Sequence, residues 1–121
     1  MRNYPAGAIR EAEAHNGPSI IIAYAPCMLH GINMTKSQVE EKRAVEAGYW
    51  PLYRYNPALE TPFIWETKEA VADFREFILS ENRYKQLLKK APAEADGILA
   101  QAEADAKRRM EFYKSVGEVM K

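Results

Sequence analysis

The longest unbroken run of apolar residues lies between Ser19 and Ala25 and is rich in isoleucine. Gly17-Pro18 precedes this run, and Pro26 follows it. A short apolar run without polar alternation is typical of a strand covered on both faces, as in a parallel sheet. Because Pro26 cannot donate a hydrogen bond to a ladder, the strand is expected to end there.

Two helices are predicted in the first half of the chain. The stretch 6–15 is rich in Ala and Glu, and an Asn-Gly pair typical of a helix C-terminus follows it. Thr35 and Ser37 each have a Gln or Glu three residues later, the spacing of a capping box. A second helix is therefore expected from one of these caps to about Ala47, with Gly48 at the C′ position.

Helical periodicity also dominates the second half. Thr67 is the predicted N-cap of a third helix, whose pattern continues towards Lys90. Pro92 suits the first turn of a long final helix with a charged outer face. The predicted apolar stripes are Val71, Phe74, Phe77 and Ile78 in the third helix, and Ala95, Ile98, Leu99, Ala102, Ala106, Met110 and Tyr113 in the final one.

A second strand is predicted in the aromatic-rich stretch 49–55, which an Asn-Pro pair terminates. Pro51 indicates that the first residues of this strand lie at an edge. Residues 58–66 are expected to be irregular but held against the surface, because their large apolar side chains need cover. Residues 1–5 are expected to be disordered.

The predicted fold class is α/β, with about two parallel strands and a helical C-terminal tail. A parallel pair leaves unpaired backbone groups at its edges, so the chain is expected to belong to a larger doubly wound sheet. Cys27 directly follows the isoleucine-rich strand. Open α/β sheets bind ligands at the carboxyl ends of their strands, so any chemistry is expected at Cys27.

The composition excludes several classes of protein. The chain has 121 residues, enough for one small domain, of which 47% are hydrophobic and 28% charged, with 17 basic and 17 acidic residues. Zero net charge gives no general attraction to nucleic acid or to anionic lipid. No segment has the length and hydropathy of a membrane span or a signal peptide. A single cysteine excludes an internal disulfide and suits a reducing cytoplasm.

Cys27 allows three interpretations from the residues alone. It could be a small buried hydrophobic residue, a metal ligand completed by residues from elsewhere, or a nucleophile with His30 as its base. Loop spacing alone does not bring an imidazole within hydrogen-bond distance of a thiol, so His30 is instead expected to fix the loop by hydrogen bonding. His15 is expected at a solvated helix end.

Two further groups of residues have both a functional and a structural interpretation. Aromatic residues beside Arg54 could stack on single-stranded nucleic acid, but the neutral charge favours packing. A basic cluster in the final helix is expected to be a solvated last turn, favourable near a helix C-terminus. The aromatic residues are Tyr49, Trp50, Tyr53 and Tyr55, and the basic residues are Lys107, Arg108 and Arg109.

Three motifs resemble the carboxyl-terminal part of pyruvate:ferredoxin (flavodoxin) oxidoreductases. They are the Gly-Pro-Ser-Ile-Ile-Ile-Ala-Tyr-Ala-Pro-Cys run of residues 17–27 with His-Gly-Ile at 30–32, Gly-Tyr-Trp-Pro-Leu-Tyr-Arg-Tyr-Asn-Pro at 48–57, and Glu-Asn-Arg-Tyr at 81–84. They occur in order at the family's spacing, and the similarity extends over nearly the whole chain from Ala6.

The resemblance implies an enzyme that oxidatively decarboxylates pyruvate on thiamine diphosphate and Mg²⁺. The acetyl group passes to coenzyme A, and electrons pass through [4Fe-4S] clusters to ferredoxin or flavodoxin. In this family the cysteine at the position of Cys27 is a ligand of the cluster nearest the thiamine. Residues 1–57 would be the end of the thiamine-diphosphate-binding domain, and 58–121 a helical C-terminal extension packed on it.

The resemblance also implies what this chain lacks. The Gly-Asp-Gly…Asn segment that holds Mg²⁺ and diphosphate, the Asn-Thr-Gly-Gly stretch after it and the remaining cluster cysteines are absent from the sequence. The chain is therefore interpreted as a truncated gene product or a separate piece that needs the upstream domains, inactive and without cofactors alone. The alternative is a non-catalytic α/β-helical interaction module.

Overall fold

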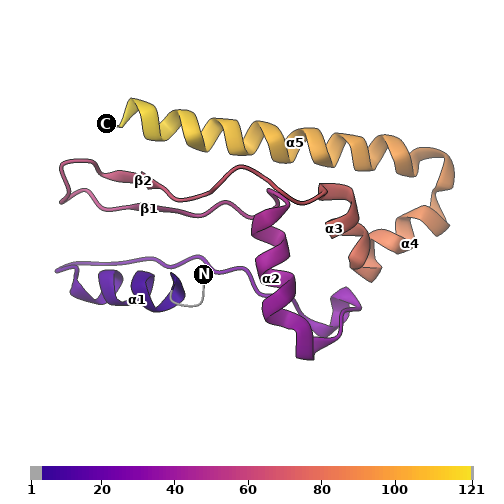
Figure 1. The fold of residues 1–121 in the computed structure, drawn as a ribbon, viewed down its shortest axis with the longest axis horizontal. Coiled ribbons are helices and arrows are strands. Elements are labelled where there is room, and N and C mark those ends of the chain that lie inside the picture. Colours follow the sequence, from indigo (N-terminus) through magenta and orange to yellow (C-terminus); the bar gives the residue numbers. More distant parts are fainter. Residues whose placement is uncertain (1–3, 121) are drawn as a thin grey trace.

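The computed structural model describes residues 4–120 (Figure 1). Within this range the chain forms helices, two short strands and two short 3₁₀ turns. The helices are α1 Tyr4–Ala14, α2 Ser37–Glu46, α3 Phe74–Ser80, α4 Asn82–Lys90 and α5 Pro92–Val119; the strands are β1 Tyr53–Tyr55 and β2 Phe63–Trp65; the 3₁₀ turns are Met28–His30 and Met34–Lys36.

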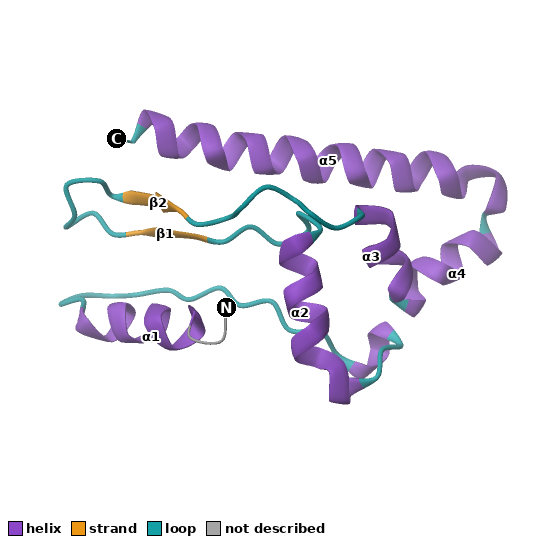
Figure 2. Ribbon diagram, viewed as in Figure 1, coloured by secondary structure: helices purple, strands orange, loops and turns teal. Residues whose placement is uncertain are grey.

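The elements form an elongated arrangement rather than a closed sheet (Figure 2). Helix α5 runs along the hairpin of β1 and β2, and it contacts β2, α3 and α4. On the other side of the hairpin lie α1 and the extended segment that returns along it. Ser19 fixes this return, because its hydroxyl donates a hydrogen bond to the Ala12 carbonyl at 2.9 Å. Helix α2 crosses between the two sides.

The predicted isoleucine-rich strand is not formed. Residues 18–26 form an extended segment outside any strand (Figure 1), and no backbone hydrogen bond joins them to any part of the chain that the structure describes. Ile20 is 88% exposed and Ile22 is 72% exposed. The prediction of a buried strand is therefore wrong for this chain in isolation, because these residues supply no neighbouring strand that could accept the segment.

The observed sheet is an antiparallel hairpin instead of the predicted parallel pair. Tyr53 lies opposite Trp65, Arg54 opposite Ile64 and Tyr55 opposite Phe63. Residues 58–66, predicted to be irregular, supply β2, and the strand predicted over 49–55 is confined to its last three residues. A short connection joins β1 to β2, so the residues that pair are close together in the sequence. Aromatic side chains on the two strands then stabilise the hairpin.

Thr67 closes the hairpin rather than beginning a helix. Its hydroxyl accepts a hydrogen bond from the Leu52 backbone N–H at 2.6 Å and donates to the Leu52 carbonyl at 3.0 Å. Helix α3 begins six residues after the predicted start, where the Asp73 carboxylate caps the Glu76 N–H at 2.7 Å. Val71 consequently lies outside the apolar stripe and is 81% exposed.

The other predicted helices are confirmed, with small shifts at their ends. Tyr4 and Pro5 belong to α1, so the prediction of disorder is wrong for them, and residues 1–3 lie outside the described range. Gly48 has a φ of 71° after α2, as a C′ glycine requires. Pro92 lies in the first turn of α5. The basic cluster at 107–109 lies in the middle of α5, not in its last turn.

The core lies where α2, α3 and α5 meet. Its buried residues are Ala44, Ala47, Phe74, Phe77, Ile78, Leu99 and Ala106. Helix α1, by contrast, buries none of its described residues. The α/β fold class is confirmed, although its only ladder among residues 4–120 is the hairpin. None of the described helices is long and apolar enough to cross a membrane.

Candidate functional site

Cys27 lies in a loop that the helical half of the molecule holds in place. Pro26 before it is buried, and Cys27 itself is half-buried with a free thiol. The backbone turns directly after the cysteine, since the His30 N–H donates to the Cys27 carbonyl at 3.0 Å. Gly31 ends the turn at a φ of 71°, a conformation that favours glycine.

Glu81, at the junction of α3 and α4, is the residue against which this loop rests. Its side chain is fully buried, at 0% exposure. The Tyr24 hydroxyl donates to its Oε1 at 3.0 Å, and the Arg83 guanidinium donates to its Oε2. Burial and the neighbouring carboxylate both raise the pKa of Tyr24, so this hydroxyl keeps its proton and remains a donor. A buried carboxylate needs such partners, because an unpaired one is strongly destabilising.

His30 approaches the same carboxylate from the other end of the loop. Its Nδ1 lies 3.7 Å from Glu81 Oε1, beyond hydrogen-bond distance, and this buried nitrogen has no partner among the residues that the structure describes. The prediction that the His30 side chain fixes the loop by hydrogen bonding is therefore wrong among the described residues, where only its backbone N–H closes the turn. Among residues 4–120 no hydrogen bond joins the Cys27 thiol to the His30 imidazole, so the structure gives no support to a Cys27–His30 nucleophile.

Arg83 connects this cluster to the aromatic core. Its guanidinium also donates to the Tyr49 hydroxyl at 3.2 Å and lies 4.8 Å from the centre of the Tyr84 ring. The ring of Tyr49 in turn lies 5.8 Å from that of Tyr24. The Cys27 loop, the α3–α4 junction and the start of the hairpin segment thus form one contact network.

The aromatic residues pack against one another, as the neutral charge predicts. Tyr53 stacks on Phe63 at 5.3 Å and on Tyr113 of α5 at 5.0 Å, and Trp50 lies 5.6 Å from Tyr24. Tyr55, by contrast, is 56% exposed. The basic residues of α5 are likewise engaged: Arg109 donates to the Tyr49 carbonyl at 2.8 Å, and Lys107 to Glu103 at 3.0 Å.

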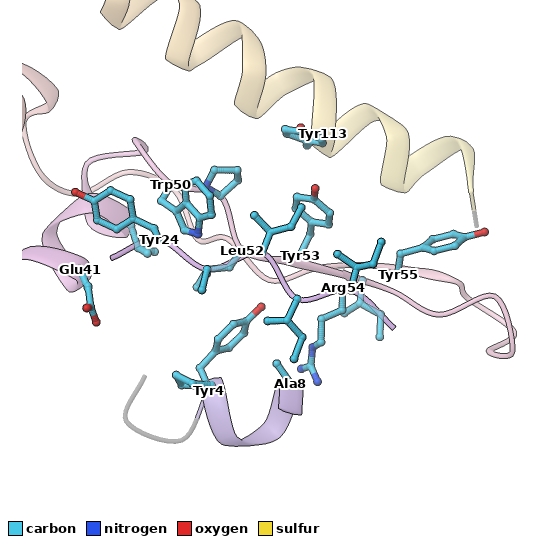
Figure 3. Close-up of a pocket in the computed structure, with 18 of the residues that line it drawn as sticks. Tyr4, Ala8, Tyr24, Glu41, Trp50, Leu52, Tyr53, Arg54, Tyr55 and Tyr113 are labelled. Carbon is cyan, nitrogen blue, oxygen red and sulfur yellow. The ribbon is translucent and has the colours of Figure 1, made fainter. Parts of the chain in front are cut away.

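A large open groove separates the N-terminal side from the hairpin (Figure 3). Its volume of ≈ 1880 Å³ exceeds the roughly 300–1,000 Å³ of typical small-molecule sites. Ile20, Ile22 and Leu52 are among its lining residues. Figure 3 shows Tyr4 and Ala8 of α1 on one side of the strand and Tyr113 of α5 on the other. Its size and isoleucine lining do not match those of a shaped small-molecule pocket.

Arg54 bridges this groove at one point. Its guanidinium pairs with Glu66 of the neighbouring chain segment and with Glu11 of α1. The hydrogen bonds from Arg54 hold the pKa of Glu66 below its ordinary value. This network joins α1 to the hairpin through polar contacts, while the apolar side chains that line the groove do not close it.

The described residues do not form a complete metal site. Cys27 is the single cysteine of the chain, and no three His, Cys, Asp or Glu residues within 4–120 lie close enough together to hold a metal ion. A [4Fe-4S] cluster is normally held by four cysteine thiolates. The donor set of this chain thus fits one ligand of such a cluster and does not fit the whole.

Glu81 and Arg83 are functional candidates that the hydrophobic pattern did not reveal. Both residues belong to the Glu-Asn-Arg-Tyr motif of the family resemblance, but the sequence alone assigns a role to neither. The sequence feature that could have indicated them is a pair of charged residues between two apolar helical stripes. A charged side chain buried at such a position needs a hydrogen-bond or ion-pair partner. That partner, Tyr24, is 57 residues away in the sequence.

A scan against models of protein families finds no match to this chain. Curated relatives, however, match most of it. The chain is 57% identical over 92% of its length to "Pyruvate:ferredoxin oxidoreductase" of Moorella thermoacetica. It is 49% identical over 88% to "Pyruvate-flavodoxin oxidoreductase" of Klebsiella pneumoniae and 47% identical over 95% to the enzyme of that name from Enterobacter agglomerans.

The chain matches a short part of pyruvate:ferredoxin (flavodoxin) oxidoreductase. It spans 10% of the length of each of these three relatives. The family resemblance read from the three sequence motifs is thereby confirmed. The unpaired isoleucine segment belongs to the N-terminal side, and the groove lies between that side, the hairpin and α5.

Proposed function

We propose that this chain is the carboxyl-terminal part of a pyruvate:ferredoxin or pyruvate:flavodoxin oxidoreductase. Residues 1–57 would end its thiamine-diphosphate-binding domain, and residues 58–121 would form a helical extension packed on that domain. The observation that carries the proposal is the 57% identity over 92% of the chain to an enzyme of this name.

In the complete enzyme, pyruvate and coenzyme A are converted to acetyl-CoA and CO₂. The reaction releases one proton and two electrons, and the electrons pass to ferredoxin or flavodoxin. Bound thiamine diphosphate with Mg²⁺ supplies the carbanion chemistry of decarboxylation, and [4Fe-4S] clusters carry the electrons. The chain alone is expected to be inactive, because it lacks the family's segment for Mg²⁺ and diphosphate.

Cys27 would contribute one thiolate to an iron–sulfur cluster whose other ligands come from upstream. Its half-buried position in an ordered turn supports this role, since a ligand must be fixed and still reachable from outside the chain. The single cysteine also supports a location in the reducing cytoplasm.

The isoleucine segment would be a strand of the wider sheet in the upstream domain. Its support is the combination of extended backbone, unpaired peptide groups and exposed side chains in residues 20–22. Exposed isoleucines of this kind mark a surface that packs against another part of a protein. The groove behind them would be filled at the same time.

A chimera tests this proposal directly. This chain replaces the matching segment of the Moorella thermoacetica enzyme, and pyruvate- and coenzyme A-dependent reduction of an electron-accepting dye is measured. We expect activity in the chimera and none when the segment is deleted. Cys27→Ser in the chimera should lower the bound iron and sulfide by up to one cluster, and Ala25→Ser in the same loop should leave both unchanged.

The contrary outcomes are equally clear. A chimera that assembles but is inactive, with iron content insensitive to Cys27→Ser, would favour the non-catalytic interaction module. A chimera that does not assemble would contradict the proposed place of this segment in the enzyme.

A further inference from the structure

The two ends of the Cys27 loop converge on one oxygen atom. Tyr24, three residues before the cysteine, donates its hydroxyl to Glu81 Oε1 at 3.0 Å, and His30, three residues after it, lies 3.7 Å from the same atom. Pro26 is buried between them. A single carboxylate oxygen therefore contacts the loop on both sides of the thiol.

Glu81 is itself rigidly placed. Its backbone N–H donates to the Ile78 carbonyl at the end of α3, and its carbonyl accepts from Tyr84 at the start of α4. Arg83 occupies the second carboxylate oxygen. Because the backbone joins two helices and one side-chain oxygen is bound to a cation, the remaining oxygen has little freedom to move.

A third contact docks the loop on the residue directly after Glu81. A Cβ at Gly31 would lie 2.2 Å from the Asn82 Cβ, closer than any real contact between two such atoms. The end of the loop is thus pressed against the α3–α4 junction, and only glycine fits there. The contacts at Tyr24, His30 and Gly31 all converge on residues 81 and 82.

We propose that Glu81 is a positioning residue that sets the location and accessibility of the Cys27 thiol, by accepting a hydrogen bond from Tyr24 on one side of it and lying beside His30 on the other. The claim concerns contacts within this chain. Its extension to the presentation of a thiolate to a metal cluster rests on the function proposed above. Tyr24 is the main connection, because it makes the one hydrogen bond between the loop side chains and Glu81 within the described residues.

The test measures the rate at which N-ethylmaleimide alkylates Cys27 in the full 121-residue chain without metal. Glu81→Ala should raise this rate about tenfold, and Tyr24→Phe should raise it several-fold, because each removes a charge-assisted hydrogen bond that closes the loop. Glu81→Gln should give a smaller rise than Glu81→Ala, since its amide oxygen still accepts from Tyr24. Matched controls are Glu76→Gln, at a 78% exposed side chain on α3, and Tyr55→Phe, at a 56% exposed residue.

Amide hydrogen exchange distinguishes positioning from general stability. In Tyr24→Phe we expect faster exchange at the His30 and Gly31 amides, whose hydrogen bonds close the turn, with protection unchanged in α5. Unchanged alkylation and loop exchange in Tyr24→Phe and Glu81→Gln would overturn the proposal. So would exchange that rises throughout the molecule, or loss of helical circular dichroism in both variants, because Glu81 would then serve overall folding.

The outcome is independent of the proposed oxidoreductase role. The loop measurements use no metal, whereas that role is tested by iron content and activity in the chimera. Slow alkylation that depends on Glu81 together with an inactive chimera would retain the positioning role and reject the metal role.

Discussion

Isoleucines on the two sides of this molecule have opposite environments. Ile78 of α3 is 1% exposed in the core, whereas Ile20 in the extended segment is 88% exposed. The first residue is covered by other elements of the chain, whereas the second is left largely uncovered by the part of the chain that the structure describes. Hydrophobicity alone therefore does not show whether a residue is buried within a chain or against another part of a larger protein.

The largest expected effect lies on the packed side. Phe77→Ala should lower the free energy of unfolding by about 3–5 kcal/mol, because it leaves a cavity at a site that is 1% exposed. Urea unfolding followed by circular dichroism measures this change. Phe112→Ala, at a 62% exposed phenylalanine of α5, is the matched control and should change stability far less. Equal losses in the two variants would show that the core is not where we place it.

Close packing of α5 on the hairpin gives the second prediction. A Cβ at Gly117 would lie 2.9 Å from the Phe63 ring, so Gly117→Ala should destabilise the chain by about 1–3 kcal/mol despite the better helix propensity of alanine. Gly97→Ala in the same helix meets no atom within 4 Å and should stabilise by about 0.5–1 kcal/mol. Melting temperatures of the two variants should therefore move in opposite directions. A rise in both would mean that α5 does not pack on β2 as described.

Much of the helical side could be predicted from the sequence. The signals there are local: Pro92 in a first turn, Gly48 after a helix, and apolar residues at helical spacing. The start of α3 could not be predicted, because the hydroxyl of Thr67 is used by Leu52, which lies 15 residues away. The second strand of the hairpin could not be predicted for a related reason. A run of three residues is too short for its alternation to be distinguished from a loop.

In the candidate site, too, local sequence features could be predicted and contacts between distant residues could not. Cys27 was predicted from its place after an apolar run and from a family resemblance. Glu81 was not assigned a role, because its importance comes from burial and from a partner 57 residues away. The isoleucine run is extended but pairs with no strand among residues 4–120, and no local pattern specifies whether a neighbouring strand exists.

The ion pairs of Arg54 with Glu11 of α1 and with Glu66 give a pH-dependent prediction. Hydrogen bonds from Arg54 lower the pKa of Glu66 from its ordinary value of 4.5 in the folded chain. This contribution to stability is present above the unfolded pKa and is lost as the pH falls through the lowered folded value. Glu66→Gln should reduce stability at neutral pH by about 1 kcal/mol or less and flatten the acid limb of the stability curve. Identical acid limbs in both proteins, measured by urea unfolding at several pH values, would argue against the ion pair.

The smallest expected effect, on the exposed side, sharpens the comparison most. Ile20→Thr keeps a β-branched side chain and removes apolar surface from a residue that is 88% exposed, so the free energy of unfolding of the chain should change by less than about 0.5 kcal/mol. In the chimera with the Moorella thermoacetica enzyme, the same substitution would place a hydroxyl in an apolar interface and should lower thermal stability measurably. Lys68→Thr, at an exposed residue on the hairpin side, is the control and should be neutral in both settings. Ile20→Thr should be costly in the chimera only if the upstream domain covers Ile20. If the chain and the chimera both tolerate the substitution, this isoleucine segment faces solvent in the enzyme as well.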